Sequence, residues 1–392
     1  MSKVKIRTKT KNGTSALAAL TASALSLPAL NSAAATAPVD NTVSYRYSSY
    51  MEDDAKESDV ATGSTKRYDI DIHQFRLSAP IGKQYSINFD ALTETMTGAS
   101  PMGTQAGSDG EPQLVMSGAS ISEDREDVTA SGTYYADKSS TTLTAGQSSE
   151  NDYKANYFGI DWELEFNKKN SALQISYSQS DDKITPTDAV AFGRIQSASK
   201  ESNALNIGLS QVLSKNSLIQ FGLGVSEDKG YLSDPYKIDD ARPTLRTRYT
   251  AITRLRHFVA KSDGAIHFDY RYYYDDWDVT SHTFNLAWHK NVTNSVQLVP
   301  SFRYYTQTEA NFYEPYKVAA NTNPYYSSDY RLSPYGAITA GLQFIHKFKH
   351  FSYTAKFERY ESDEKYSFSK VAVESPGLVS YTLLTVGFDV IF

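Results

Sequence analysis

Along most of the chain, hydrophobic and polar residues alternate with a period of two. In the segment AIHFDYRYYYD (residues 265–275), one set of alternate positions is apolar or aromatic and the other is mostly charged. Successive side chains of a β-strand point to opposite faces, so this pattern predicts a strand between two very different environments. Residues 161–166 and 219–225 repeat the pattern. The prediction for the chain is therefore an all-β protein.

The alternation predicts about sixteen strands, between roughly 14 and 18, which lies in the range of outer-membrane barrels. We expect these strands near residues 43–52, 66–79, 84–97, 125–137, 140–149, 153–167, 171–180, 202–213, 217–227, 246–260, 264–277, 280–290, 295–308, 335–348, 351–362 and 379–392. Each strand signal is weak by itself, so the connections between strands carry much of the inference.

These connections alternate in length. Short turns are expected at residues 80–82, 137–139, 167–170, 214–216, 261–264, 291–294 and 349–350. Longer polar loops are expected near residues 98–124, 181–201, 228–245, 309–334 and 363–378, and the first of them as an irregular segment. Short periplasmic turns and long external loops are typical of bacterial barrels. The sequence thus predicts a single-chain transmembrane antiparallel β-barrel in the outer membrane, with both termini in the periplasm.

The end of the chain, TVGFDVIF, supports this prediction. Its positions Thr385, Gly387, Val390 and Phe392 resemble the insertion signal of outer-membrane proteins. The assembly machinery needs an edge strand that it can pair with before the barrel closes. We therefore expect two partners, the barrel assembly machinery and outer-membrane lipid.

A soluble β-sandwich or propeller is the alternative fold, because its strands alternate as well. In those folds the apolar face consists mainly of Val, Ile and Leu, and loop lengths need not alternate by side. This chain instead has 29 Tyr and 18 Phe, and it shows no repeat of propeller length. The barrel explains the pattern better.

Residues 1–35 are predicted to be a secretory signal peptide, which leaves residues 36–392 for the barrel. A basic segment (residues 3–11) precedes a short apolar stretch (residues 16–30), and Ala33 to Ala35 offer small residues for cleavage. No later run approaches the roughly 20 apolar residues of a membrane-spanning helix.

Composition removes several classes of function. The absence of cysteine excludes disulfides, thiolate metal sites and cysteine nucleophiles. With 39 Lys and Arg against 45 Asp and Glu, the chain lacks the positive balance typical of nucleic-acid binding. We expect no nucleic-acid partner.

Charged residues of one parity are predicted to line the lumen. Arginines of residues 246–256 can pair with carboxylates of residues 267–275 on the next strand, and opposite charges on a pore wall filter polar solutes. These pairs could equally brace the wall. A second acidic region contains His73 and could hold a cation, although wet carboxylates need none. The predicted lumen-lining residues are Asp69, Asp71, Asp90, Glu94, Arg246, Arg248, Arg254, Arg256, His267, Asp269, Arg271 and Arg303.

Two small-residue motifs, residues 97–100 (TGAS) and 117–120 (SGAS), resemble the acceptor motif for covalent flavin mononucleotide (FMN). Ser100 and Ser120 are the candidate attachment sites. The acidic residue usual three places earlier is Glu94 in the first copy, where Asp is usual, and Leu114 in the second. Small residues in loops also serve turns.

The segment DYRYYYDDWDVTSHT (residues 269–283) contains the candidates for catalysis: Asp275, Asp276, Asp278 and His282. With Ser281 they could form a hydrolase at the outer rim. Adjacent strand residues point to opposite faces, so Ser281 and His282 pair only in an irregular hairpin. Three tyrosines of the same segment (270, 272 and 274) share the lipid-facing parity and predict an aromatic girdle.

Residues 116–125 (MSGASISEDR), 271–283 (RYYYDDWDVTSHT) and 302–312 (FRYYTQTEANF) resemble an uncharacterised family of Gram-negative outer-membrane barrels, domain of unknown function 3570. The resemblance implies a single-chain barrel. It also implies genes beside a flavin transferase, a small lipoprotein and a thioredoxin-like protein, and hence a redox or flavin-linked export system.

We therefore expect a monomeric or trimeric outer-membrane barrel that acts as a channel or as the membrane component of an exported redox or secretion system. Two alternatives remain open at this point. One is an outer-rim hydrolase, and the other is a flavin-modified barrel linked to extracytoplasmic electron transfer, with a lipoprotein or flavin transferase as partner.

Overall fold

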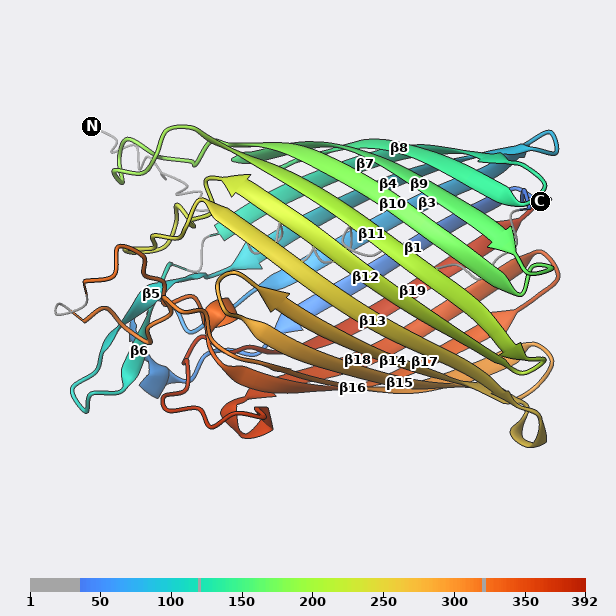
Figure 1. The fold of residues 1–392 in the computed structure, drawn as a ribbon. Helices are drawn as coiled ribbons and strands as arrows, with labels where there is room; N and C mark the ends of the chain where they lie inside the picture. The colour runs from blue at the N-terminus through green and yellow to red at the C-terminus, as the bar shows by residue number, and fades with distance from the viewer. Residues whose placement is uncertain (1–35, 119–120, 319–321) are drawn as a thin grey trace, which may run out of the picture.

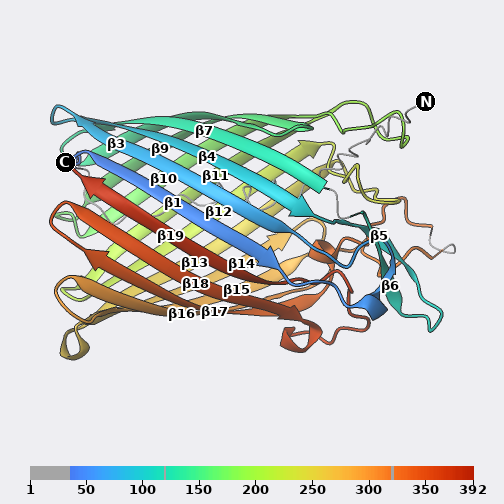
Figure 2. The same ribbon diagram turned by 180° about the vertical axis from the view of Figure 1, so that it is seen from behind.

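The computed structural model describes residues 36–118, 121–318 and 322–392, so the predicted signal peptide lies outside the described residues. Within the described ranges, sixteen antiparallel strands close into one barrel (Figures 1 and 2). Each strand pairs with the barrel strands next to it in the sequence, and the first pairs with the last. The predicted all-β barrel is confirmed.

All sixteen expected strands overlap strands of the structure. The barrel strands are β1 (Thr42–Glu52), β3 (Asp69–Ile81), β4 (Tyr85–Gly98), β7 (Ile121–Tyr135), β8 (Ser139–Ser149), β9 (Tyr153–Phe166), β10 (Ser171–Ile184), β11 (Ala198–Ser214), β12 (Ser217–Gly230), β13 (Leu245–Val259), β14 (Gly264–Asp275), β15 (Thr280–Asn291), β16 (Val296–Gln307), β17 (Tyr335–Lys347), β18 (Phe351–Asp363) and β19 (Ser380–Ile391).

The outer face of the barrel is apolar. On β12, Phe221, Leu223 and Val225 are exposed, and Leu223 is 67% exposed. Their partners on β11 are exposed leucines and an isoleucine. Side chains on the convex face of a closed sheet diverge, and an apolar band of this kind is stable only against lipid. The chain is therefore an outer-membrane barrel. In the described part of the chain, no helix is both long and apolar enough to span a membrane.

The two ends of the barrel differ in the length of their connections. Figure 1 shows the long loops gathered at one end and the short turns at the other, where the C-terminus lies. Thr42 pairs with Ile391, so β1 begins at that same end. We call the two ends the loop end and the turn end. That the turn end faces the periplasm stays a prediction.

The segment 98–124 is not the irregular loop that the sequence predicts. It contains β5 (Pro101–Ala106) and β6 (Pro112–Met116), which join β2 (Val60–Thr62) in a three-stranded sheet at the loop end. Two of these strands pair in parallel across a long sequence separation. All three are too short to show a periodic pattern, so local alternation gives no signal for them. Short 3-10 helices add η1 (Glu57–Asp59), η2 (Ala260–Ser262), η3 (Tyr330–Leu332) and η4 (Glu364–Tyr366).

The seam between β1 and β19 closes the barrel through polar contacts on the inner face. Asp389 accepts hydrogen bonds from Ser44 at 2.7 Å and from Arg46 at 2.7 Å. Ser48 and Thr385 are hydrogen-bonded at 2.8 Å. Gly387 faces Arg46, and a Cβ at this glycine would lie 2.7 Å from the carbonyl oxygen of Tyr45 as well as against the Arg46 side chain.

Gly387→Ala is expected to weaken closure of the seam, because the added methyl group meets backbone and displaces Arg46. Forced overpacking of this kind costs about 1–3 kcal/mol. The measurement is the fraction of folded, heat-modifiable barrel after refolding, with the urea midpoint of unfolding. Gly132→Ala is the matched control, since a Cβ there meets nothing within 4 Å. Equal folded fractions for the two variants would contradict this account of the seam.

Candidate functional site

The inner wall of β13, β14 and β16 carries most of the predicted lumen arginines. On β13, the exposed Tyr249 marks the outer parity, so the four arginines between residues 246 and 256 lie on the inner face. The same parity places His267, Asp269 and Arg271 inward on β14, opposite the exposed Tyr272. Arg303 lies inward on β16.

Three of these arginines form ion pairs along the wall. Arg246 contacts Asp275 at 2.6 Å and Arg256 contacts Asp269 at 2.5 Å, so the pairing that the sequence predicts between β13 and β14 is present. The guanidinium of Arg248 turns the other way and contacts an aspartate of β12, Asp228, at 2.6 Å. Opposite charges on neighbouring strands stabilise the wall in this way.

The other three arginines are not in ion-pair contact with a carboxylate. Within the described residues, Arg254, Arg271 and Arg303 take part in no ion pair. Each lies near the middle of its strand, and the side chain of Arg303 is exposed although it points inward. The wall therefore carries a net positive charge that faces the lumen.

A negative wall faces this positive one. On β9, Asp161 and Glu163 lie opposite in parity to the exposed Phe158 and Ile160, and in the described structure neither forms an ion pair. β9 and β16 are seven strands apart in the sixteen-strand circle, which is almost diametrically opposite. The unpaired carboxylates of β9 thus lie across the interior from Arg303, while β13 and β14 are four and five strands away from β9.

The structure places Asp69 and Asp71 on the outer face, not in the lumen as the sequence predicts. They share the parity of the exposed Phe75, and Tyr47 on the outer face donates a hydrogen bond to Asp71 at 2.6 Å. At the loop end the interior is filled by buried residues, including Ile70 and Met96. Apolar side chains point inward there, so the charged positions of the alternation face outward. This is the reverse of the arrangement at membrane level.

The other carboxylates of this acidic region do lie on the inner face. Asp90 contacts Arg76 at 2.5 Å, and Glu94 contacts the buried Arg125 at 3.1 Å. His73 shares the outer face with Asp71, and its ring centre lies 5.2 Å from that of Tyr47. Among the described residues, no group of three His, Asp or Glu side chains is arranged to hold a metal ion.

Asp275 has a local structural role at the end of β14. It is fully buried and accepts hydrogen bonds from the backbone N–H groups of Trp277 and Val279, both at 3.0 Å, besides its pair with Arg246. The carboxylate therefore fixes the tight turn into β15. Its burial removes it from the outer rim, where the hydrolase hypothesis needs a carboxylate.

The remaining hydrolase candidates are not brought together. Ser281 and His282 follow a regular register, so Ser281 points inward and His282 outward. His282 shares a hydrogen bond with Tyr270 at 2.9 Å and packs against Phe368. Asp276 is exposed, and Asp278 sits in the turn with positive φ, where Asn311 donates to it at 3.0 Å.

The two candidate flavin sites differ in what the structure describes. Ser100 is buried, and its N–H donates to the hydroxyl of Ser117 at 2.9 Å. Attachment of a flavin at Ser100 would require this part of the loop end to open. Ser120 lies outside the described residues.

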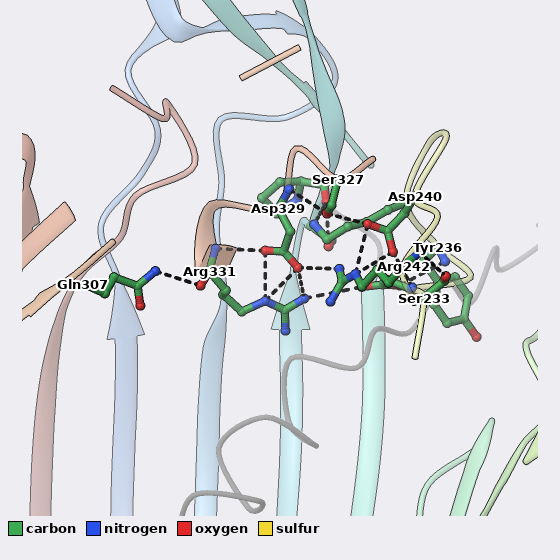
Figure 3. A network of polar contacts seen from close by, with 12 residues as sticks. Ser233, Tyr236, Asp240, Arg242, Gln307, Ser327, Asp329 and Arg331 are labelled. Carbon is green, nitrogen blue, oxygen red and sulfur yellow. Dashed lines mark hydrogen bonds and ion pairs between the residues drawn. The ribbon is translucent and has the colours of Figure 1, made fainter. Parts of the chain in front are cut away.

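Charged residues of two long loops form a network that sequence reasoning did not find. We call residues 231–244, 308–318 and 322–334 the loop cap. In Figure 3 its polar centre lies beyond the strands at the loop end. Arg242 donates to Asp329 at 2.9 Å and to Asp240 at 2.9 Å. Arg331 binds the same Asp329 at 2.5 Å and approaches Asp234 at 3.5 Å.

Asp329 is the centre of this network and is fully buried. Burial raises the pKa of its carboxyl, but Arg331, Lys237 and Arg242 outweigh that effect and hold the pKa well below its usual range. The loop cap also has an apolar cluster that it shares with the β14–β15 turn, where its Phe312 packs edge-on against Trp277. It is therefore a folded unit with its own polar and apolar interior.

The loop cap is joined to several sectors of the barrel. Tyr236 donates a hydrogen bond to Asp152, in the loop between β8 and β9. Tyr330 lies 5.8 Å from the guanidinium of Arg67, which pairs with Glu52 on β1 at 2.8 Å. The N–H of Ile238 donates to the carbonyl of residue 102 in β5 at 2.6 Å. In the circle of strands, β1 and the β8–β9 loop are four to five strands apart.

A buried acidic group lies next to one of these attachments. Arg125 contacts Glu94 at 3.1 Å, Asp127 at 3.6 Å and Glu150 at 3.8 Å, so one guanidinium serves three carboxylates. Glu150 lies in the β8–β9 loop. Burial, with Asp152 beside it, raises its pKa to about 8. Burial also raises the pKa of Asp152.

Comparison with known proteins gives one family match. The family model described as "Protein of unknown function (DUF3570)" matches residues 17–381. No curated protein matches the chain.

Several solved barrels are similar in fold. The siderophore receptor PirA from Acinetobacter baumannii is 10% identical over 83% of this chain and 53% of its own, with a TM-score of 0.44. A bacterial polysaccharide outer membrane secretin is 9% identical over 91% and 99%, with 0.48. CdiB from Acinetobacter baumannii is 6% identical over 91% and 60%, with 0.48. The chain spans about half the length of the siderophore receptor.

The contribution of Glu150 to the stability of the barrel is expected to fall as pH rises from about 4.5 to about 8. Its carboxyl keeps a proton in the folded state that the unfolded chain, in which a glutamate has its ordinary pKa of 4.5, releases in this window. The slope is at most about 1.4 kcal/mol per pH unit for one group. Glu150→Gln should flatten the dependence of the thermal midpoint on pH, whereas the exposed Glu111→Gln should not. A slope unchanged by Glu150→Gln would refute the assignment.

Proposed function

Because the chain belongs to the family of proteins of unknown function DUF3570 and folds as a closed outer-membrane barrel, we propose that it is a solute channel whose outer mouth is covered by the loop cap. The loop end faces the cell exterior in this proposal. The observation that carries it is the pair of unpaired, oppositely charged walls on the inner face.

The width of the barrel supports an aqueous interior. Barrels of about sixteen strands enclose more space than side chains fill, unlike those of about eight. The inward-pointing Arg303 is exposed, as expected for a side chain that water reaches.

The charge distribution supports selection of polar solutes. A solute between Asp161 on β9 and Arg303 on β16 experiences a field directed across the channel. Such a field orients dipolar and charged solutes and slows apolar ones. Charges without partners contribute most, because paired charges largely cancel at a distance.

The attachments of the loop cap support a role in covering the mouth. The cap connects β12 with β13 and β16 with β17, and it contacts the β8–β9 loop and Arg67 next to β1. These attachment points are distributed around the circle of strands, so the cap extends over the space between them. The buried ion pairs at the centre of the loop cap stabilise it in this covering position.

The outer-rim hydrolase has less support, because Ser281 and His282 point to opposite faces of the wall. The redox, secretion and flavin hypotheses rest on the family resemblance and on the motif at Ser100. No contact among the described residues adds to them.

The expected behaviour of the purified protein in a planar bilayer is stepwise conductance, increased by Asp329→Ala. Removing the shared carboxylate takes the main acceptor from Arg331 and one of the two carboxylates bound by Arg242, which keeps Asp240. Breaking a buried pair of this kind costs about 3–5 kcal/mol. The cap should therefore open more often. Asp239→Ala is the control, since Asp239 makes a more exposed pair with Lys317 at 3.4 Å.

Both variants must first show the heat-modifiable mobility of a folded barrel. Absence of any conductance from folded wild-type protein in the bilayer would refute the channel. Conductance that is the same in wild type and Asp329→Ala would refute the role of the cap while leaving the channel in place.

A further inference from the structure

The three unpaired arginines lie close together on the inner wall. In the strand register, Arg254 pairs with Asp269, Asp269 with Asn285 and Asn285 with Arg303, which gives one continuous row across four strands. Adjacent strands are about 4.8 Å apart, so the ends of this row are separated by about 14 Å at the backbone. Arg271 lies two residues from Asp269 toward the loop end. Three long side chains from these positions can converge on one small solute.

The inner face of β13, β14 and β16 carries a net positive charge. Of the six arginines on the inner face of β13, β14 and β16, three are paired with Asp228, Asp269 and Asp275. Asp269 lies within the row, but one of its oxygens is bound to Arg256 at 2.5 Å. The row therefore retains the charge of three arginines. Concentrating three like charges beside one carboxylate that already pairs with Arg256 is unfavourable unless an anion shares the site.

Unused hydrogen-bond donors lie on the same wall. The Nε atoms of Arg271 and Arg248 are shielded from bulk solvent and make no hydrogen bond in the described structure. An unpaired buried donor costs about 1–3 kcal/mol. Arginine presents its N–H groups in a planar fork that matches the oxygens of phosphate and carboxylate.

Neutral groups complete the surroundings. In the register, Thr283 lies between Arg271 and Tyr305, and Asn285 lies between Asp269 and Arg303. The amide of Asn285 can donate to solute oxygens without adding charge, whereas Thr283 is buried beside it. The ring of Tyr273 lies 6.0 Å from the guanidinium of Arg271 and limits the space on that side.

We propose that Arg254, Arg271 and Arg303 form a binding site in the lumen for a small solute with at least two negative oxygens, either a phosphate or a dicarboxylate. The inference deepens the proposed channel function and rests on it for the route by which the solute arrives. Binding itself is a property of the folded barrel and is measurable without conductance. A bracing role does not account for these arginines, because bracing requires partners, and the three arginines that brace this wall have them.

The test is calorimetric titration of the detergent-solubilised full-length barrel with inorganic phosphate and, separately, with succinate. Low ionic strength is used, because salt screens charges. Saturable binding of phosphate, succinate or both by wild type is expected. Arg271→Gln and Arg303→Gln should each weaken it by about tenfold or more, which corresponds to about 1.4 kcal/mol. Arg271→Lys keeps the positive charge but lacks the planar guanidinium. Its affinity for the anion should therefore lie between those of wild type and Arg271→Gln.

Arg76→Gln is the control, because Arg76 is also on the inner face but is paired with Asp90 on a distant sector. It should bind like wild type. Binding of phosphate alone assigns phosphorylated solutes, and binding of succinate alone assigns carboxylates. No binding by folded wild type, or equal affinities in wild type and both arginine variants, would overturn the site.

Failure of the site and failure of the channel give different results. Anion binding that depends on Arg271 and Arg303, without bilayer conductance, retains the site and removes the channel. Conductance without anion binding retains the channel and removes the site. In a conducting barrel, phosphate should also reduce current in wild type more than in Arg303→Gln.

Discussion

The constraint on which the rest of this structure depends is that every backbone N–H and C=O group inside a membrane must be paired within the protein. A sheet meets this requirement only when its first and last strands pair and no edge remains. Here β1 and β19 form that pair along their whole length, from Thr42–Ile391 to Glu52–Tyr381. Closure dictates two faces, one in lipid and one in water. The alternation of apolar and polar residues in the sequence follows from these two environments.

Closure also explains why charge collects inside. The outer face accepts few charges at membrane level, so polar side chains of sixteen strands share one interior. Pairs such as Arg256–Asp269 relieve part of the resulting repulsion. The pairs are unevenly distributed around the circle, and the remaining charges are positive near Arg303 and negative near Asp161. The excess of positive charge on one wall is the physical basis of both the proposed solute selection and the proposed anion site.

The sequence predicts the barrel well because its signal is local: each strand separates the same two environments, and parity assigns faces without knowledge of the fold. The same reasoning gave the pairing of β13 arginines with β14 carboxylates, of which Arg246–Asp275 is one example. It failed for Asp69 and Asp71, because the interior near Ile70 and Met96 is apolar and reverses the parity. It also missed the loop cap, since Arg242 and Asp329 are 87 residues apart and no periodic pattern joins them. Neighbouring Asp and Arg residues in 239–242 and 329–331 were the available signal.

The loop cap and the adjoining β8–β9 loop respond to pH in opposite senses. The folded-state pKa of Asp329 is depressed, so its contribution to stability is present above the unfolded pKa and is lost only as pH falls through the much lower folded value. Glu150 has a raised pKa, so its neighbourhood loses stability as pH rises toward about 8. Tyr236 links the two regions through Asp152. Around neutral pH this attachment gives the cap a route of response to acidity, whereas the centre at Asp329 does not change its charge there.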